Sequence, residues 1–248
     1  MTKRRTFVAA TDRGLVRRNN EDAYIILDAN DQQTFVLILA DGMGGHQKGE
    51  VASSIAVHYA AETMEGWLTP ERSDREILDQ MGEILERANV KVYLESVISP
   101  GSKGMGTTLT MGVVIRGSLL LAHVGDCRVY LMRKQRLYQL TNDHTLTQAL
   151  YDAGEISEAE IETHPQRHVL TRALGVPDYM QADLLNIPIE AGDRLIFSSD
   201  GLHGFVQQAE IREVMLRAQN PEVMVRSLIN LANRRGGQDN VTVIGGFI

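Results

Sequence analysis

Nine short runs of apolar or alternating residues recur along the chain, and the short gaps between some of them constrain the fold most. Runs of this kind are typical of β-strands. They cover Thr6–Thr11, Ala23–Asp28, Thr34–Ala40, Thr107–Ile115, Ser118–Val124, Arg128–Arg133, Arg136–Leu140, Arg194–Ser198 and Asn240–Ile248. Two gaps, Arg116-Gly117 and Lys134-Gln135, are only two residues long. Such gaps permit hairpins but leave no room for a helical crossover, so the sheet is predicted to be largely antiparallel.

Four longer stretches carry apolar residues at helical spacing, which predicts amphipathic helices. They cover Gly49–Trp67, Asp74–Val97, Ala209–Arg217 and Pro221–Arg234. The stripe predicted for the second of them runs from Ile77 to Ile98. Two pairs of helices thus interrupt a set of strands, a pattern typical of the α+β class. We expect a single domain over residues 1–248, with a four-layer α-β-β-α sandwich of two mainly antiparallel sheets between helix pairs.

Composition excludes several classes of protein. The chain has 32 acidic and 25 basic side chains and a formal net charge of −7, which disfavours a broad nucleic-acid-binding face. Its longest purely apolar run, Phe35–Ala40, is far below the ~20 residues of a membrane-spanning helix. The single cysteine, Cys127, cannot form an internal disulfide, which fits a reducing compartment. We expect a cytoplasmic protein without nucleic-acid or membrane partners, and a monomer, because no strong exposed apolar stripe is predicted.

Acidic residues recur where predicted strands begin or end. They are Glu21, Asp22, Asp41, Asp126, Asp200 and Asp239. Asp41 and Asp200 are each followed by glycine, and a single Asp-Gly pair is explained by ordinary turn chemistry. Their repetition at the ends of apolar strands favours convergence at one edge of a sandwich.

Converging carboxylates repel one another and need a cation. Oxygen ligands without cysteine or paired histidine select Mg²⁺ or Mn²⁺ over zinc. Two such ions ~3.5–4 Å apart would lower the pKa of a shared water and make it a nucleophile. The pattern therefore predicts hydrolysis of phosphoesters. Arg17 lies four residues before Glu21 and is the candidate phosphate ligand, because a guanidinium can contact two phosphate oxygens at once; the alternative is a solvated surface charge.

Seven segments together resemble the metal-dependent 2C-type protein serine/threonine phosphatases, most of all their compact bacterial type. The resemblance extends over about residues 6–248. The segments are D-x-G-x-x-R-x-x-N-E-D at Asp12–Asp22, DGMGGH at Asp41–His46, MGTT at Met105–Thr108, HVGD-x-RVY at His123–Tyr130, HPQRHVLTRALG at His164–Gly175, SSDGL at Ser198–Leu202 and GGQDNVTVI at Gly236–Ile244.

The resemblance implies a core site with two Mn²⁺ or Mg²⁺ ions at one end of the sandwich. Asp41 would bridge both ions. The Gly42 carbonyl and Glu21 would serve one ion, and Asp200 with Asp239 would serve the other.

Two further acidic residues have roles implied by the same resemblance. Asp22 would hold metal-bound waters, and Asp126 would contribute to a third, weaker metal position. The family mechanism is direct attack by the bridging hydroxide on phosphoserine or phosphothreonine in proteins, without a phosphoenzyme. Such an activity belongs to signal transduction through phosphorylated proteins.

The sequence departs from the family pattern near the candidate general acid. Many animal members have histidine directly after the Asp-Gly pair, where this chain has Met43. His46 lies three residues further on, as in bacterial members; it is either an acid or substrate-positioning group, or a capping or surface histidine. Residues 143–175 correspond to the family's flap, which lies near the metal centre.

Two other functions stay open from the sequence. A non-catalytic phosphoprotein-binding relative would have lost acidic ligands, and all six are present. A hydrolase of small phosphoesters could use the same centre, although the GMGG segment lacks the Lys-Ser/Thr that follows a phosphate-binding P-loop.

Overall fold

Two antiparallel sheets form the centre of the molecule. The computed structural model describes residues 6–29, 33–44 and 48–248. One sheet has the strand order β1-β11-β10-β7-β8, and the other has the order β2-β3-β5-β6-β9, with β4 paired to β3. All of these pairings are antiparallel. The bounds are β1 Thr6–Asp12, β2 Asp22–Asp28, β3 Phe35–Met43, β4 Gly106–Thr107, β5 Leu109–Ile115, β6 Ser118–Val124, β7 Arg128–Arg133, β8 Arg136–Gln139, β9 Asp183–Pro188, β10 Arg194–Ser198 and β11 Val241–Phe247.

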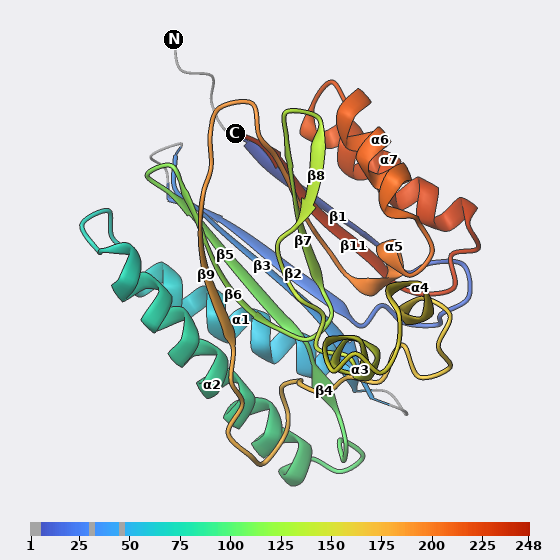
Figure 1. The fold of residues 1–248 in the computed structure, drawn as a ribbon. Helices are drawn as coiled ribbons and strands as arrows, with labels where there is room; N and C mark the ends of the chain where they lie inside the picture. Colours follow the sequence, from blue (N-terminus) through green and yellow to red (C-terminus); the bar gives the residue numbers. More distant parts are fainter. Residues whose placement is uncertain (1–5, 30–32, 45–47) are drawn as a thin grey trace.

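Helix pairs cover the outer faces of both sheets (Figure 1). Helices α1 (Gly49–Trp67) and α2 (Asp74–Ile98) pack on the second sheet, and α6 (Gln208–Arg217) and α7 (Pro221–Arg234) pack on the first. A third apolar cluster fills the space between the two sheets, with side chains such as Leu37 and Phe197. The predicted four-layer α+β sandwich is therefore confirmed.

Local signals explain where the main elements begin and turn. Helix α2 starts at a capping box in which Ser73 and Glu76 exchange hydrogen bonds. Helix α7 starts with the Asn220 side chain as cap and Pro221 at its first position. The two-residue hairpin Lys134-Gln135 has positive φ at both positions, 48° and 66°, as a twisted type I′ hairpin requires.

The structure corrects three predictions of local structure. Strand β9 was not predicted; it pairs with β6, and its alternate residues are exposed. Strand β3 does not end before Asp41, because Gly42 and Met43 continue the ladder by pairing with β4. Ile98 does not belong to a buried stripe, since it is 73% exposed at the end of α2.

The segment 143–175 contains two short helices, α3 (Leu146–Asp152) and α4 (Glu158–Ile161). Its ends are fastened by isolated bridges between Thr145 and Leu170 and between Thr107 and Leu174. Together with α5 (Asp200–His203), these helices lie at one end of the sandwich (Figure 1). Among the described residues, no helix is both long and apolar enough to cross a membrane.

Candidate active site

A pocket of about 520 Å³ lies at the end of the sandwich that carries α5. Most of the sequence-predicted site residues line it: Arg17, Glu21, Asp41, Gly42, Asp126, Asp200 and Asp239. Asp41 and Gly42 lie on β3 of the second sheet, Asp200 begins α5 just after β10 of the first sheet, and the others lie in connecting loops, so segments that follow both sheets build the pocket. Asp22 lies next to it, and His46 lies outside the described residues.

Two threonines hold the backbone of Asp41. The Asp41 N–H donates to Thr108 Oγ1 at 2.8 Å, and Thr107 Oγ1 donates to the Asp41 carbonyl at 2.9 Å. Asp41 is also the cross-strand partner of Asp22 in the β2–β3 ladder. The carboxylate of Asp41 therefore leaves a fixed backbone and points into the pocket that it lines.

Asp22 is a buried carboxylate with only one of its two oxygens satisfied. Oδ2 accepts hydrogen bonds from Ser199 Oγ at 2.8 Å and Thr242 Oγ1 at 2.6 Å, whereas the buried Oδ1 has no protein partner. Burial raises the pKa of Asp22 to about 7, although the two hydroxyls oppose the shift. A buried oxygen without a partner is costly unless something outside the protein chain completes its contacts.

The other carboxylates of the pocket are destabilised as anions in the same way. Burial, reinforced by the charges of neighbouring aspartates, raises the pKa of Asp41 and of Asp126 well above its usual range. Burial and the charge of Asp239 also raise the pKa of Asp200. Burial and the nearby Glu50 raise that of Glu21. A bound cation would reverse these shifts, because it stabilises the ionised carboxylates.

Arg17 and Asn240 organise the loop between β1 and β2. Arg17 Nη2 pairs with Asp239 Oδ2 at 2.6 Å. The Asn240 Nδ2 donates to the carbonyls of Arg13 and Asn19, both at 2.9 Å, and its Oδ1 accepts from the Glu21 N–H at 2.8 Å. One buried amide thus holds both ends of the loop and sets the position of Glu21.

The donor set fits hard divalent cations. It consists of carboxylate oxygens, the Gly42 carbonyl and the unpartnered Asp22 Oδ1, and oxygen donors of this kind suit Mn²⁺ or Mg²⁺. As the side chains lie, no group of three or more His, Cys, Asp or Glu in the described ranges is arranged so that it could hold a metal ion.

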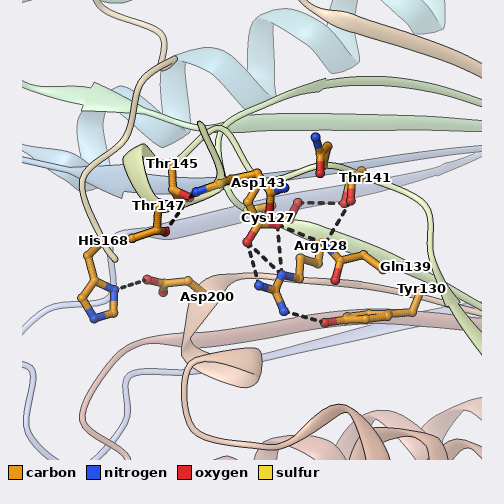
Figure 2. Close-up of polar contacts among 12 residues, drawn as sticks. Cys127, Arg128, Tyr130, Gln139, Thr141, Asp143, Thr145, Thr147, His168 and Asp200 are labelled. Carbon is orange, nitrogen blue, oxygen red and sulfur yellow. Dashed lines mark hydrogen bonds and ion pairs between the residues drawn. The ribbon is translucent and has the colours of Figure 1, made fainter. Parts of the chain in front are cut away.

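A second cavity of about 290 Å³ adjoins the pocket and shares Asp126, Asp200 and His168 with it. Arg128 and Asp143 line this cavity, and Figure 2 shows their contacts: Arg128 Nη2 pairs with Asp143 Oδ2 at 2.7 Å, and Arg128 Nη1 donates to the Tyr130 hydroxyl at 3.2 Å. His168, on the segment 143–175, lies with Nδ1 3.8 Å from Asp200 Oδ2.

Sequence reasoning missed the residues that support the predicted carboxylates. Thr107, Thr108, Ser199, Thr242 and Asn240 hold Asp41, Asp22 and Glu21 in place. All five lie inside the quoted motifs, and Ser199 and Asn240 directly adjoin Asp200 and Asp239, so their positions were a usable signal.

Cys127 is fully buried and packs against Thr108. Burial and the charge of Asp41 raise the pKa of its thiol well above the usual value. The thiolate needed for nucleophilic attack is therefore disfavoured.

Comparison with known proteins gives concordant results. The family model described as Protein phosphatase 2C matches residues 16–239. The chain is 36% identical over 234 residues to the serine/threonine phosphatase stp of Listeria monocytogenes serotype 4b, which covers 94% of this chain and 92% of the relative. The serine/threonine phosphatase of S. agalactiae superposes with a TM-score of 0.90 at 34% identity, over 98% of this chain and 99% of the other.

A further solved structure bears on the metal content. It is the catalytic domain of the serine threonine protein phosphatase PstP in complex with two manganese ions, with a TM-score of 0.84 and 34% identity over 98% of this chain and 97% of that one. The match of the family model to most of the chain, together with these likenesses, shows that this chain belongs to the protein phosphatase 2C family.

Proposed function

We propose that this chain hydrolyses phosphoserine and phosphothreonine in proteins. The reaction would take place in the 520 Å³ pocket, at a centre of two Mn²⁺ or Mg²⁺ ions. Hydroxide derived from water would attack the phosphate directly, without a phosphoenzyme. The observation that carries the proposal is the concentration of carboxylates with raised pKa in one pocket. Buried acids that repel one another destabilise the fold, and a cation site accounts for their presence.

The proposed roles follow the chemistry of the donors. Asp41 would contact both ions, Glu21 and the Gly42 carbonyl would hold one, and Asp200 with Asp239 would hold the other. When bound, the ions would supply a water of lowered pKa and neutralise charge on the phosphate. Asp126 shares the pocket with Asp200, which supports a role for it at a third, weaker position.

The chain's own residues would position the reactants. Asp22 has one oxygen held by Ser199 and Thr242 and the other unpartnered, which supports a role in accepting a hydrogen bond from water. Arg17 has its guanidinium at the pocket, beside Asp239, which supports binding of two phosphate oxygens. Fixed donors and acceptors of this kind promote in-line attack because they require little reorganisation.

Phosphate release tests the function. The purified chain, with Mn²⁺ or with EDTA, is given a phosphothreonine peptide, the matching phosphotyrosine peptide and ATP. We expect metal-dependent release that is much faster from the phosphothreonine peptide. Faster turnover of ATP would instead favour a hydrolase of small phosphoesters. Acid quenching after reaction with ³²P-labelled peptide should leave no label on the protein; a labelled chain would contradict direct attack.

A further inference from the structure

We propose that the loop between β1 and β2 carries a substrate-docking lip, residues Arg13–Arg18, which binds phosphoprotein segments that have an aliphatic side chain and acidic residues near the phosphorylated residue. The inference rests on the proposed phosphatase function and names the substrate class that the site prefers. Leu15 and Val16 form the centre of the lip.

Leu15 and Val16 are two largely exposed aliphatic residues. Their exposed fractions are 70% and 65%. They are consecutive in the chain and precede Arg17, which lines the pocket. Single exposed apolar residues need no explanation, but adjacent ones beside a catalytic pocket are typical of an interaction site.

Hydrogen bonds hold the backbone of the lip, so its exposed side chains do not belong to an unsupported loop. The Gly14 N–H donates to Asp12 Oδ1 at 2.8 Å, and the Leu15 N–H donates to the Gly237 carbonyl at 2.7 Å. Asn240 holds both ends of the loop by its hydrogen bonds to Arg13 and Asn19. A surface that is already ordered loses little entropy when a ligand binds.

Gly14 shows how closely the lip packs on the segment that precedes β11. Its φ is +77°, and a Cβ at this position would lie 2.2 Å from the Asp239 carbonyl oxygen. No side chain other than hydrogen fits there. The backbone of the lip is therefore set against the residues that form the wall of the pocket.

The lip borders the mouth of the pocket. Leu15 is bonded to Gly237, and the next residues along the chain, Gln238 and Asp239, line the pocket together with Arg17. In Figure 1, the loop after β1 lies at the same end of the sandwich as α4 and α5. A peptide whose phosphorylated residue occupies the pocket would therefore pass over Leu15 and Val16.

Charge defines the remaining chemistry of the partner. The lip contains three arginines and no acidic residue, in a chain whose net charge is −7. Arg17 is paired with Asp239, and Arg13 contacts the Arg18 carbonyl. The lip as a whole is therefore a positive rim with an apolar centre, which is complementary to an acidic segment with an aliphatic residue.

The test compares peptides on the intact chain loaded with Mn²⁺. One phosphothreonine peptide carries leucine and glutamate on both sides of the phosphothreonine, a second has serine for leucine, and a third has lysine for glutamate. p-Nitrophenyl phosphate serves as a substrate without flanking residues. We expect wild-type kcat/KM to fall about tenfold from the first peptide to the second, which corresponds to loss of one well-buried aliphatic contact.

The double variant Leu15→Ser, Val16→Ser should lose this preference. Its KM for the leucine peptide should rise about tenfold, while its kcat and its turnover of p-nitrophenyl phosphate stay unchanged. The matched control is Val97→Ser, Ile98→Ser, at comparably exposed positions on α2, which should alter none of these values. Arg18→Gln should reduce the preference for glutamate over lysine, and added salt should do the same in wild type.

Three results would overturn the inference. They are equal wild-type kcat/KM for the leucine and serine peptides, a preference that persists in the double variant, and the same loss in the α2 control. Failure of the proposed function looks different, because no phosphorylated substrate, p-nitrophenyl phosphate included, would then be turned over.

Discussion

An aspartate lies just outside each end of strand β10, and the two differ in whether a basic side chain compensates their charge. Asp193, just before the strand, is 1% exposed and bonded to Arg133, with Nε 2.9 Å from Oδ1. It also accepts from the Glu190 N–H at 2.8 Å. Asp200, two residues beyond the other end, has no ion pair with lysine or arginine in the described residues; its one ionic contact there is His168 at 3.8 Å.

The difference separates an acid whose charge the protein compensates from one whose charge it leaves without a cationic lysine or arginine, at the two ends of one strand. Asp193 has its charge compensated by the protein, as a buried carboxylate requires for stability. Asp200 shares its pocket with other carboxylates, and burial together with Asp239 raises its pKa. The carboxylates at the pocket end therefore carry an energetic cost, which a bound cation would offset.

The largest expected effect is on turnover. Asp200→Asn removes one charged ligand from the pocket, so kcat/KM for a phosphothreonine peptide should fall by about 10²–10³. The free energy of unfolding without metal should stay equal or rise, because a repulsive charge is lost. Steady-state kinetics and urea unfolding measure the two quantities. Normal turnover in this variant would remove Asp200 from the proposed centre.

The same change at the other end of the strand should act on stability. Asp193→Asn removes the anion that binds Arg133, which should cost about 2–3 kcal/mol of unfolding free energy, because Arg133 is partly exposed and keeps its contact with Glu190. The kcat of the folded fraction should be unchanged, since Asp193 does not line the pocket. If the Asp193→Asn variant were as stable as wild type, the ion pair of Asp193 would not stabilise the fold, and the contrast with Asp200 would fail.

The stability of metal-free protein should depend on pH. Burial raises the pKa of Asp22 from 3.8 to about 7 in the folded state. The unfolded chain therefore binds fewer protons at this group than the folded chain between these values, and the contribution of Asp22 to stability should be greatest below pH 3.8 and be lost as pH rises through about 7. For this group the fall is on the order of 2–4 kcal/mol.

Added Mn²⁺ should reverse this trend, because it binds the ionised carboxylates of the folded state. Thermal melts in EDTA and in Mn²⁺ at several pH values provide the measurement. A melting temperature independent of pH in EDTA would contradict the energetic cost that we assign to ionised Asp22 in the folded protein.

The smallest effect is expected at the mouth of the pocket. Arg17→Lys keeps the charge but loses the planar pair of donors, so KM for the phosphopeptide should rise roughly tenfold. Stability should change by less than about 1 kcal/mol, because the pair with Asp239 is half-exposed. Arg75→Lys, in an exposed pair on α2, is the matched control. Equal KM values in the two variants would make Arg17 a surface charge.

Local pattern predicted most of the architecture. The alternating runs, the two-residue hairpins and the capped amphipathic stretches correspond closely to the observed strands and helices, because periodicity reports which side of an element is buried. The acidic residues at strand ends indicated one shared edge, and the structure places six of the seven proposed metal-site residues around one pocket, with Asp22 beside it.

Other features depended on contacts between distant parts of the chain. Strand β9 forms where β6 offers a free edge, and β3 extends past Asp41 because β4 pairs with it. Ile98 is exposed because α2 continues past the sheet that it covers.

By itself, the sequence determined the α+β layering, the family and the set of acidic residues, since these follow from patterns between near neighbours and from ordered motifs. Only the tertiary structure decided which carboxylates receive a partner. The glycine after Asp200 distinguishes it from Asp193 in the sequence, but the surroundings of both come from elsewhere in the chain: from Arg133 on β7 for Asp193, and from Asp41 and Asp239 for Asp200. Compensation of a buried charge is a property of three-dimensional neighbours, which no local pattern encodes.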